Sequence, residues 1–476
     1  MIDRRQLMTG AGALALSGAV PGIAAAQSGF VSKRPPKAQR KFASKAVEAE
    51  IRRVKAKIAD PELAWMFENC YPNTLDTTVN MGEVDGKPDA FVITGDINAM
   101  WLRDSSAQLQ TYVHLASKDA DLRRLFRGAI ARQARCILID PYANAFTADP
   151  TAMTQLDAKN DKTEMKPGVA ERKWEIDSLC YPMRMAHAYW TQTRDKVPFD
   201  DLWSQGAAKS VATLIEQQRK TSDGPYRFQR LNVSPTETLM FGGLGAPTRK
   251  VGLIHSMFRP SDDATFYPFL IPSNLFAVSA LRMLAQVQRE ARGDEAAAGA
   301  AEALATEVEA ALAAHGRMPD GKGGEVWAFE ADGYGNTIFM DDANVPSLSG
   351  LPLLGAAKRD DPFFRKTAAL AWSERNPYFF AGSAAQGIGG PHIGLDMIWP
   401  MSIITRALNS VDDAEITQCL RWLKTTHAGT GFIHESFHKD DPKNFTRSWF
   451  AWANGLFGDL MLDLERRKPA LLKATL

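Results

Sequence analysis

The run WEIDSLCYPMRMAHAYWTQT, residues 174–193, decides the fold class. Its apolar residues recur three and four positions apart, which is the pattern of a helix that buries one face. The same periodicity fills windows at 43–58, 105–116, 121–138, 201–218, 273–290, 297–314, 362–374, 395–408, 413–426 and 445–466. The sequence therefore predicts roughly a dozen helices of ordinary length.

Strand-like segments are short and fall between these windows, at residues 90–93, 226–228 and 325–329. Strands and helices do not alternate regularly, which disfavours a doubly wound sheet or a TIM barrel. No period of 20–50 residues is evident, which disfavours a solenoid. We therefore predict an all-α fold, an (α/α)6 toroid with six inner helices, six outer helices and short strands in its loops.

The composition excludes several classes of protein. The 476 residues include 56 Lys and Arg against 55 Asp and Glu, and their usage is close to the globular average. Such a balanced charge argues against a nucleic-acid or anionic-lipid partner, which would require a basic patch. After residue 26 no stretch approaches ~20 uninterrupted apolar residues, so we expect no membrane span in the mature chain.

Residues 1–26 have the pattern of an export signal. Arg4 and Arg5 precede a small and apolar core, and residues 24–26 form an A-x-A cleavage site. The paired arginines and the Gly/Ala-rich core indicate the twin-arginine pathway. An amphipathic N-terminal helix is the alternative, and the glycines and the proline of the core disfavour it. We therefore expect an exported, periplasmic protein.

The four cysteines have neither C-x-x-C spacing nor a regular period, so metal or redox roles are not indicated. We expect buried thiols at Cys70, Cys136, Cys180 and Cys419.

Polar and aromatic residues gather in six clusters, each in a loop or at the start of a helix. The clusters are 94–105, 174–178, 258–264, 340–346, 389–400 and 429–438. Taken singly, Asp104, Asp177 and Asp263 could each be a routine N-cap. Taken together, acids, Trp, Arg and Asn in apolar surroundings indicate a sugar site. Carboxylates and amides there bind hydroxyls, and indole faces pack on the C–H surfaces of sugar rings.

Cleavage of a glycosidic bond needs two carboxyl groups in different environments, one protonated and one ionised. Glu435 lies between His434 and a Phe-rich stretch, so its environment can differ from that of Asp262 and Asp263. The two adjacent aspartates repel each other, which can raise the pKa of one of them and suit it to be the acid. The residues leave open which of the two aspartates that is.

Residues 434–438 also match H-E-x-x-H, the signature of zinc peptidases. That mechanism requires a helix long enough to place both histidines on one face. Here Gly429 and Gly431 precede the motif and Pro442 follows it, which leaves too little chain for such a helix. We therefore expect no metal site.

Four ordered blocks resemble glycoside hydrolase family 125, and the resemblance runs over roughly residues 40–465. The blocks are Trp101-Leu102-Arg103-Asp104-Ser105, Phe258-Arg259-Pro260-Ser261-Asp262-Asp263, Gly390-Pro391-His392 and His434-Glu435-Ser436. The resemblance implies an exo-acting, inverting α-1,6-mannosidase with an (α/α)6 fold that needs neither metal nor another cofactor. It also implies that residues 27–476 form a single catalytic domain acting on mannose-containing glycans.

The resemblance also assigns roles to residues. It places the general acid at Asp262 and the general base at Glu435, and a shift of one residue would move the acid to Asp263. Substrate-binding roles are expected for Trp101, Arg103, Asp104, Glu175, Asp177, Arg259, Asp263, Asp342, Asn344, His392 and His434.

Three other functions are compatible with parts of the pattern. One is another inverting α/α-toroid glycosidase, such as a glucosidase, which activity on glucosides would reveal. A second is a non-catalytic periplasmic glycan-binding protein, which would tolerate the loss of Glu435 without losing affinity. The third is a zinc peptidase, which chelators would inhibit.

Overall fold

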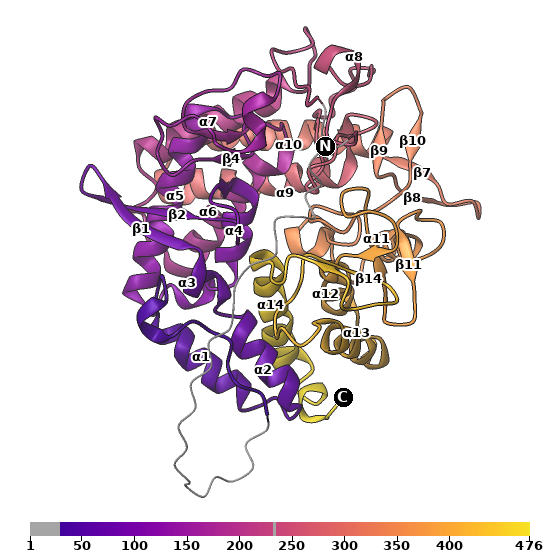
Figure 1. Ribbon diagram of the computed structural model, residues 1–476. Helices are drawn as coiled ribbons and strands as arrows, with labels where there is room; N and C mark the ends of the chain where they lie inside the picture. Colours follow the sequence, from indigo (N-terminus) through magenta and orange to yellow (C-terminus); the bar gives the residue numbers. More distant parts are fainter. Residues whose placement is uncertain (1–28, 232–234) are drawn as a thin grey trace, which may run out of the picture.

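The computed structural model describes residues 29–231 and 235–476, and its fold is the predicted helical toroid. The inner ring comprises α4 (Leu102–Gln110), α6 (Ile176–Thr193), α9 (Ile271–Val287), the 3-10 helix η6 (Leu351–Leu354), α12 (Pro400–Asn409) and α14 (Ala451–Arg467). Successive members pack against each other from α14 through α4 and α6 to α9 and η6, and α12 packs against α14. Figure 1 shows α4, α6, α12 and α14 around the centre of the molecule.

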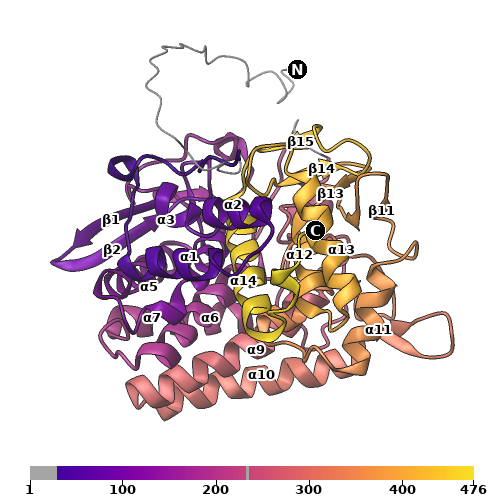
Figure 2. The ribbon, with the colours of Figure 1, turned by 90° about the horizontal axis from the view of Figure 1, so that it is seen from below.

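The outer ring covers these helices. It comprises α1 (Lys45–Lys55), α2 (Pro61–Cys70), α5 (Ala120–Ile139), α7 (Asp201–Glu216), α10 (Glu295–His315), α11 (Pro362–Ala371) and α13 (Asp413–Thr426). Figure 2 shows α10 along one outer edge, where it packs on α9. Two shorter helices, α3 (Asn73–Thr77) and α8 (Met240–Gly243), lie in connections.

The two rings begin their helices in different ways. Every outer helix starts with a side chain that accepts a backbone N–H; these caps are Ser44, Asp60, Asp119, Asp200, Asp294, Asp361 and Asp412. The inner α-helices have no such cap, and their N-cap residues are Trp101, Glu175, Leu270, Trp399 and Phe450. A side-chain cap contributes about 1 kcal/mol to stability. Its absence at the N-termini of the inner helices therefore indicates that this end of the inner ring has a functional role.

All strands are short and antiparallel, and three small sheets precede inner helices. They are β3–β4–β5 (Met100–Trp101, Ala145–Phe146, Val169–Glu171), β6–β9–β10 (Phe269–Leu270, Glu330–Ala331, Thr337–Ile338) and β13–β14–β15 (Met397–Ile398, Ser436–His438, Phe445–Thr446). The hairpins are β1–β2 (Val79–Val84, Lys87–Val92), β7–β8 (Arg317–Pro319, Glu325–Trp327) and β11–β12 (Phe379–Ala381, Gln386–Ile388). The sheets hold the loops at the uncapped ends of the inner helices.

Some local predictions were wrong. Residues 226–228 form no strand; Tyr226 and Phe228 alternate with polar residues because both rings are buried in a loop. The windows at 395–408 and 445–466 start too early, since α12 begins at Pro400 and α14 at Ala451. Trp399 and Phe450, the residues directly before these helices, line a cleft and extend the helical pattern without being helical.

One continuous hydrophobic core extends from Val47 to Leu472. All four cysteines are free and buried, which confirms the prediction of buried thiols, and burial raises the pKa of Cys136 and of Cys419 to about 12. Within residues 29–231 and 235–476, no helix is both long and apolar enough to cross a membrane. The export signal predicted at residues 1–26 lies outside the described residues.

A pair of glycines tests the packing of the loop before β14. Gly431 has a φ of +76°, and a Cβ atom there would lie 2.6 Å from the Trp65 ring; Gly429 has a φ of +78° and open space around it. We expect Gly429→Ala to cost about 1–2 kcal/mol for the left-handed backbone. Gly431→Ala should cost about 1–3 kcal/mol more because the extra methyl overpacks the core. Melting temperatures check this, and equal losses in the two variants would contradict the packing argument.

Candidate active site

A cleft of about 410 Å³ opens at the uncapped ends of the inner helices. Seven of the predicted site residues line it: Trp101, Arg103, Asp104, Asp262, Asn344, His392 and Glu435. Its other lining residues are Thr94, Ile97, Pro260, Ser261, Trp399, Arg447, Phe450 and Trp452. Five of the six sequence clusters contribute to this lining, although they lie far apart in the chain.

Asp262 stands on a strained turn at the cleft wall. Its φ is +71°, a left-handed conformation that a non-glycine residue adopts only where its surroundings impose it. The Lys173 ammonium supports this turn by donating to the Asp262 carbonyl at 3.0 Å, and it lies 3.8 Å from the carboxyl Oδ1. The side chain of Asp262 is 27% exposed, while Lys173 is 1% exposed.

The environment of Asp262 destabilises its ionised form relative to that of an exposed aspartate. Burial raises the pKa of Asp262 above its ordinary value, while the Lys173 ammonium opposes the rise. Burial also raises the pKa of Asp263, yet only 1% of that residue is exposed and it does not line the cleft. Of the two adjacent aspartates, Asp262 is therefore the one that can reach a ligand.

Glu435 lies immediately before β14, and 15% of its side chain is exposed. The Arg447 guanidinium donates to its Oε1 through Nη1 at 3.2 Å. The neighbouring His434 does not line the cleft: its ring stacks on Phe445 at 3.9 Å, and its Nδ1 lies 3.0 Å from the Ser448 carbonyl. His434 therefore holds the backbone beside Glu435.

Arg103 connects the cleft to two acids beneath it. Its Nη1 donates to Glu175 at 2.5 Å and to Asp177 at 3.0 Å, and both carboxylates are fully buried. Burial raises the pKa of Glu175 and of Asp177, against the attraction of Arg103. Glu175 and Asp177 were predicted as substrate ligands, but the structure places them behind Arg103 and not in the cleft lining.

Arg259 and Asp342 lie behind the turn that carries Asp262. Arg259 pairs with Glu330 at 2.7 Å, and Asp342 accepts a hydrogen bond from Ser261 at 2.6 Å. Burial raises the pKa of Asp342 to about 7. Neither residue lines the cleft, so their contacts fix the turn from behind.

The alternative interpretation of three aspartates as helix caps was wrong. Asp104 and Asp177 lie in the first turns of α4 and α6, whose N-cap residues are Trp101 and Glu175. Asp263 precedes no helix. Asp104 instead accepts a hydrogen bond from Thr94.

Aromatic rings form one wall of the cleft. His392 stacks on Trp399 with ring centroids 6.4 Å apart, and Phe450 contacts both Trp399 and Trp452. Arg103 lies over the Trp452 ring at 5.9 Å. Such a wall suits the apolar face of a sugar ring.

The sequence predicted no site role for Arg447, Phe450 and Trp452, because they fall in the window at 445–466 that predicts a helix. A signal was present: Arg447 is followed by Trp449 and Phe450 directly before α14, and by Trp452 in its first turn. Residues 447–452 thus form a further cluster of a cation with aromatic residues at the start of a helix.

Several polar atoms at the cleft are buried and have no hydrogen-bond partner within the described parts of the chain. They are Asp262 Oδ1, Asn344 Nδ2, Trp399 Nε1, Arg103 Nε and Arg447 Nε. Buried polar groups in native proteins are nearly always paired with protein or water. Several buried polar atoms without a partner are expected together in a cleft where a hydroxyl-rich ligand or ordered water forms hydrogen bonds with them.

The H-E-x-x-H segment is not a helix. Residues 436–438 form strand β14, which confirms that this segment lacks the geometry of a zinc peptidase. In residues 29–231 and 235–476, no three His, Cys, Asp or Glu side chains are grouped so that they could hold a metal ion.

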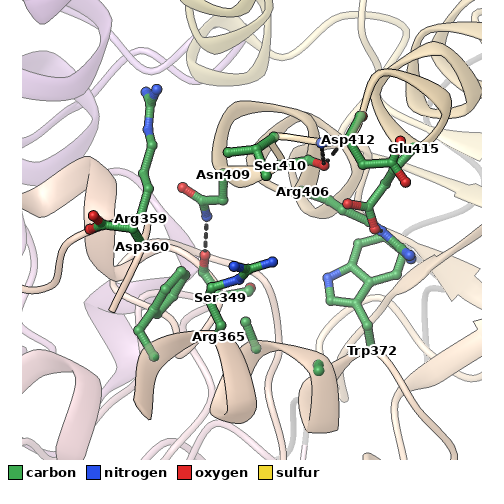
Figure 3. A pocket seen from close by; sticks show the side chains of 14 residues that line it. Ser349, Arg359, Asp360, Arg365, Trp372, Arg406, Asn409, Ser410, Asp412 and Glu415 are labelled. Carbon is green, nitrogen blue, oxygen red and sulfur yellow. Dashed lines mark hydrogen bonds and ion pairs between the residues drawn. The ribbon is translucent and has the colours of Figure 1, made fainter. Parts of the chain in front are cut away.

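A larger pocket of about 1020 Å³ lies between α11, α12 and α13 (Figure 3). Its acids are Asp360, Asp412 and Glu415; Asp412 caps α13, and Glu415 pairs with Arg406 at 2.6 Å. Two of the three acids therefore have structural roles. The smaller cleft, in which Asp262 lies beside Lys173 and Glu435 pairs with Arg447, is the better candidate for an active site.

Comparisons with known proteins agree with this location. Residues 60–462 match the family model described as "Metal-independent alpha-mannosidase (GH125)". The chain is 43% identical to the Meiotically up-regulated gene 157 protein of Schizosaccharomyces pombe over 457 residues, which cover 93% of this chain and 90% of that one.

Solved structures show the same fold. A metal-independent α-mannosidase of Streptococcus pneumoniae, in a non-productive complex with α-1,6-mannobiose, is 38% identical and superposes with a TM-score of 0.85, covering 90% of this chain and 100% of that one. A further glycosidase superposes with a TM-score of 0.52 at 12% identity over 85% of this chain and 97% of its own. This second likeness shows the fold alone.

Proposed function

The chain belongs to the GH125 family of metal-independent α-mannosidases, and from this premise we propose that it removes terminal α-1,6-linked mannose from glycans with inversion. It is a glycoside hydrolase with α-mannosidase activity. What we propose beyond this activity is the α-1,6 linkage, the inversion and the roles of the catalytic residues.

The observation that carries the proposal is the pair of carboxyl groups on one cleft, Asp262 and Glu435, in unlike surroundings. Asp262 has a raised pKa, which suits a group that must hold a proton until it gives it to the glycosidic oxygen. Glu435 accepts a hydrogen bond from Arg447 at one oxygen, and we assign to its other oxygen the deprotonation of a water molecule. In an inverting enzyme the two carboxyl groups stand about 6.5–9.5 Å apart, which leaves room for that water.

The remaining walls support a mannose substrate. Trp399, Phe450 and Trp452 offer an aromatic surface for the ring, and Asn344, Asp104 and Arg103 offer polar groups for its hydroxyls.

The α-1,6 linkage is supported by the mannobiose bound to the Streptococcus pneumoniae structure. The test is incubation of the purified protein, with a chelator, with α-1,6-, α-1,3- and α-1,2-mannobiose and with an α-glucoside. We expect mannose from the α-1,6 isomer first. Preferred cleavage of another isomer or of the glucoside would reassign the substrate, binding without cleavage would indicate a sugar-binding protein, and inhibition by the chelator would contradict metal independence.

We also propose export through the twin-arginine pathway to the periplasm, from the sequence of residues 1–26 alone. Changing Arg4 and Arg5 together to Lys should retain the protein in the cytoplasm, because the pathway reads the arginine pair. Cell fractionation measures this, and unchanged export would contradict the proposal.

A further inference from the structure

Arg447 is the cation that pairs with the proposed base, and the sequence patterns gave it no role. Its side chain is 16% exposed, and its φ of +44° is a left-handed conformation unusual for arginine. Non-glycine residues hold such a conformation only where their surroundings compensate its cost of about 1–3 kcal/mol. The backbone is therefore held so that this side chain points at the cleft.

Three groups accept hydrogen bonds from the Arg447 guanidinium. Nη1 donates to Glu435 Oε1 at 3.2 Å, and Nη2 donates to the Thr94 carbonyl at 3.0 Å and to Asp96. The Nε atom is buried and has no partner among the described residues. Nη2 is thus committed to the loop at residues 94–96, and among the described residues Glu435 is the only carboxyl group lining the cleft that the guanidinium binds.

The segments carrying Glu435 and Arg447 are tied face to face. Strands β14 and β15 pair Ser436 with Thr446, whose hydroxyl groups lie 2.6 Å apart. On the other side of Glu435, the His434 Nδ1 lies 3.0 Å from the Ser448 carbonyl. The contact between Glu435 and Arg447 is therefore bracketed by a contact on each side.

The loop at residues 94–96 is shaped to receive Arg447. Gly95 has a φ of +74°, and a Cβ atom there would lie 3.2 Å from Arg447 Nη2. Asp96, which is 42% exposed at its side chain, binds the outer end of the guanidinium. Two consecutive ion pairs, Asp96 with Arg447 and Arg447 with Glu435, thus connect the surface to the cleft.

We infer that Arg447 is a positioning residue: held by Asp96 and the Thr94 carbonyl, it fixes one oxygen of Glu435 so that the other faces the attacking water. This inference rests on the proposed function of Glu435. The guanidinium of Arg447 binds the Glu435 carboxylate through one Nη atom and the loop at residues 94–96 through the other, which the single ammonium of a lysine cannot reproduce. Misplacing a reacting group by about 1 Å can cost about 10²-fold in rate.

The test is kinetic. Arg447→Gln should lower kcat on α-1,6-mannobiose by about 10²-fold and leave KM within about threefold, because the base and not the sugar loses its partner. Arg447→Lys should recover only part of the rate. Asp96→Asn, a change at the exposed end, should lower kcat several-fold in the same direction and keeps the test available if Arg447→Gln fails to fold.

The matched control is Arg467→Gln on α14. Arg467 also joins an acid, Asp463, to backbone carbonyls and is 21% exposed, but it lies outside the cleft lining. We expect its loss to lower the melting temperature and to leave kcat unchanged. A purely structural role for Arg447 would give that same result at Arg447 and would overturn the inference.

A double variant separates this inference from the proposed function. If Arg447 acts through Glu435, the double variant of Glu435→Gln and Arg447→Gln should be no slower than Glu435→Gln alone. If the fold-losses in kcat of the two single variants multiply in the double variant, or if Arg447→Gln changes KM alone, the inference is overturned. Neither result would remove Glu435 as the proposed base. Full activity of Glu435→Gln would overturn the proposed function and this inference together.

Discussion

Asp262→Asn is expected to lower kcat on α-1,6-mannobiose by about 10²–10⁴-fold, the usual contribution of a general acid. The amide keeps the size of the side chain but has no proton of suitable acidity to give to the departing sugar oxygen. A mannoside with a dinitrophenyl leaving group needs no such proton. On that substrate the variant should keep a rate within about tenfold of the native enzyme.

The pH profile gives a second readout of the same variant. The pKa of Asp262 is raised by burial, so its protonated form persists to a higher pH than that of an ordinary aspartate. Activity should be present below this pKa and should be lost as the pH rises through it. In Asp262→Asn, assayed on the activated mannoside, that basic limb should be absent.

Asp263→Asn is the matched control, since Asp263 is adjacent but lies behind the cleft wall. Its loss should change the activated and the unactivated substrates to the same degree. The assignment of the acid would move to Asp263 if this variant, and not Asp262→Asn, showed selective recovery on the dinitrophenyl mannoside.

Glu435→Gln is expected to lower kcat by about 10²–10⁴-fold on both substrates. The reason is that water still has to be deprotonated whichever group leaves, so an activated leaving group gives little recovery. Recovery on the dinitrophenyl mannoside would show that Glu435 acts on the leaving group and would exchange the two roles.

The sequence predicted the architecture because helical periodicity is a repeated signal. The helices of both rings leave repeated apolar stripes, and the single run at 174–193 already contains both the stripe and the polar cluster at its start. The boundaries at Pro400 and Ala451 were missed because cleft residues and core residues are chemically alike. Trp399 and Phe450 continue the helical pattern, although their backbone is extended.

The sequence predicted which clusters form the site. It did not predict which residues of each cluster line the cleft and which lie behind that lining. Glu175 and Asp177 have the composition of ligands, and only the fold shows that Arg103 stands between them and the cleft. Asp262 and Asp263 are equivalent in sequence, and the turn at a φ of +71° decides which of the two reaches the cleft. Contacts such as Arg447 with Glu435 and Asp96 depend on pairing between distant loops, which no local pattern records.

Single displacement at an α-mannoside by Asp262 and Glu435 is the central proposal for this enzyme. The direct measurement is proton NMR of the first mannose released from α-1,6-mannobiose, recorded before the anomers equilibrate in solution. Inversion predicts that β-mannose appears first and that the α-anomer grows in later. Initial release of α-mannose would show retention through a covalent intermediate and would contradict the account.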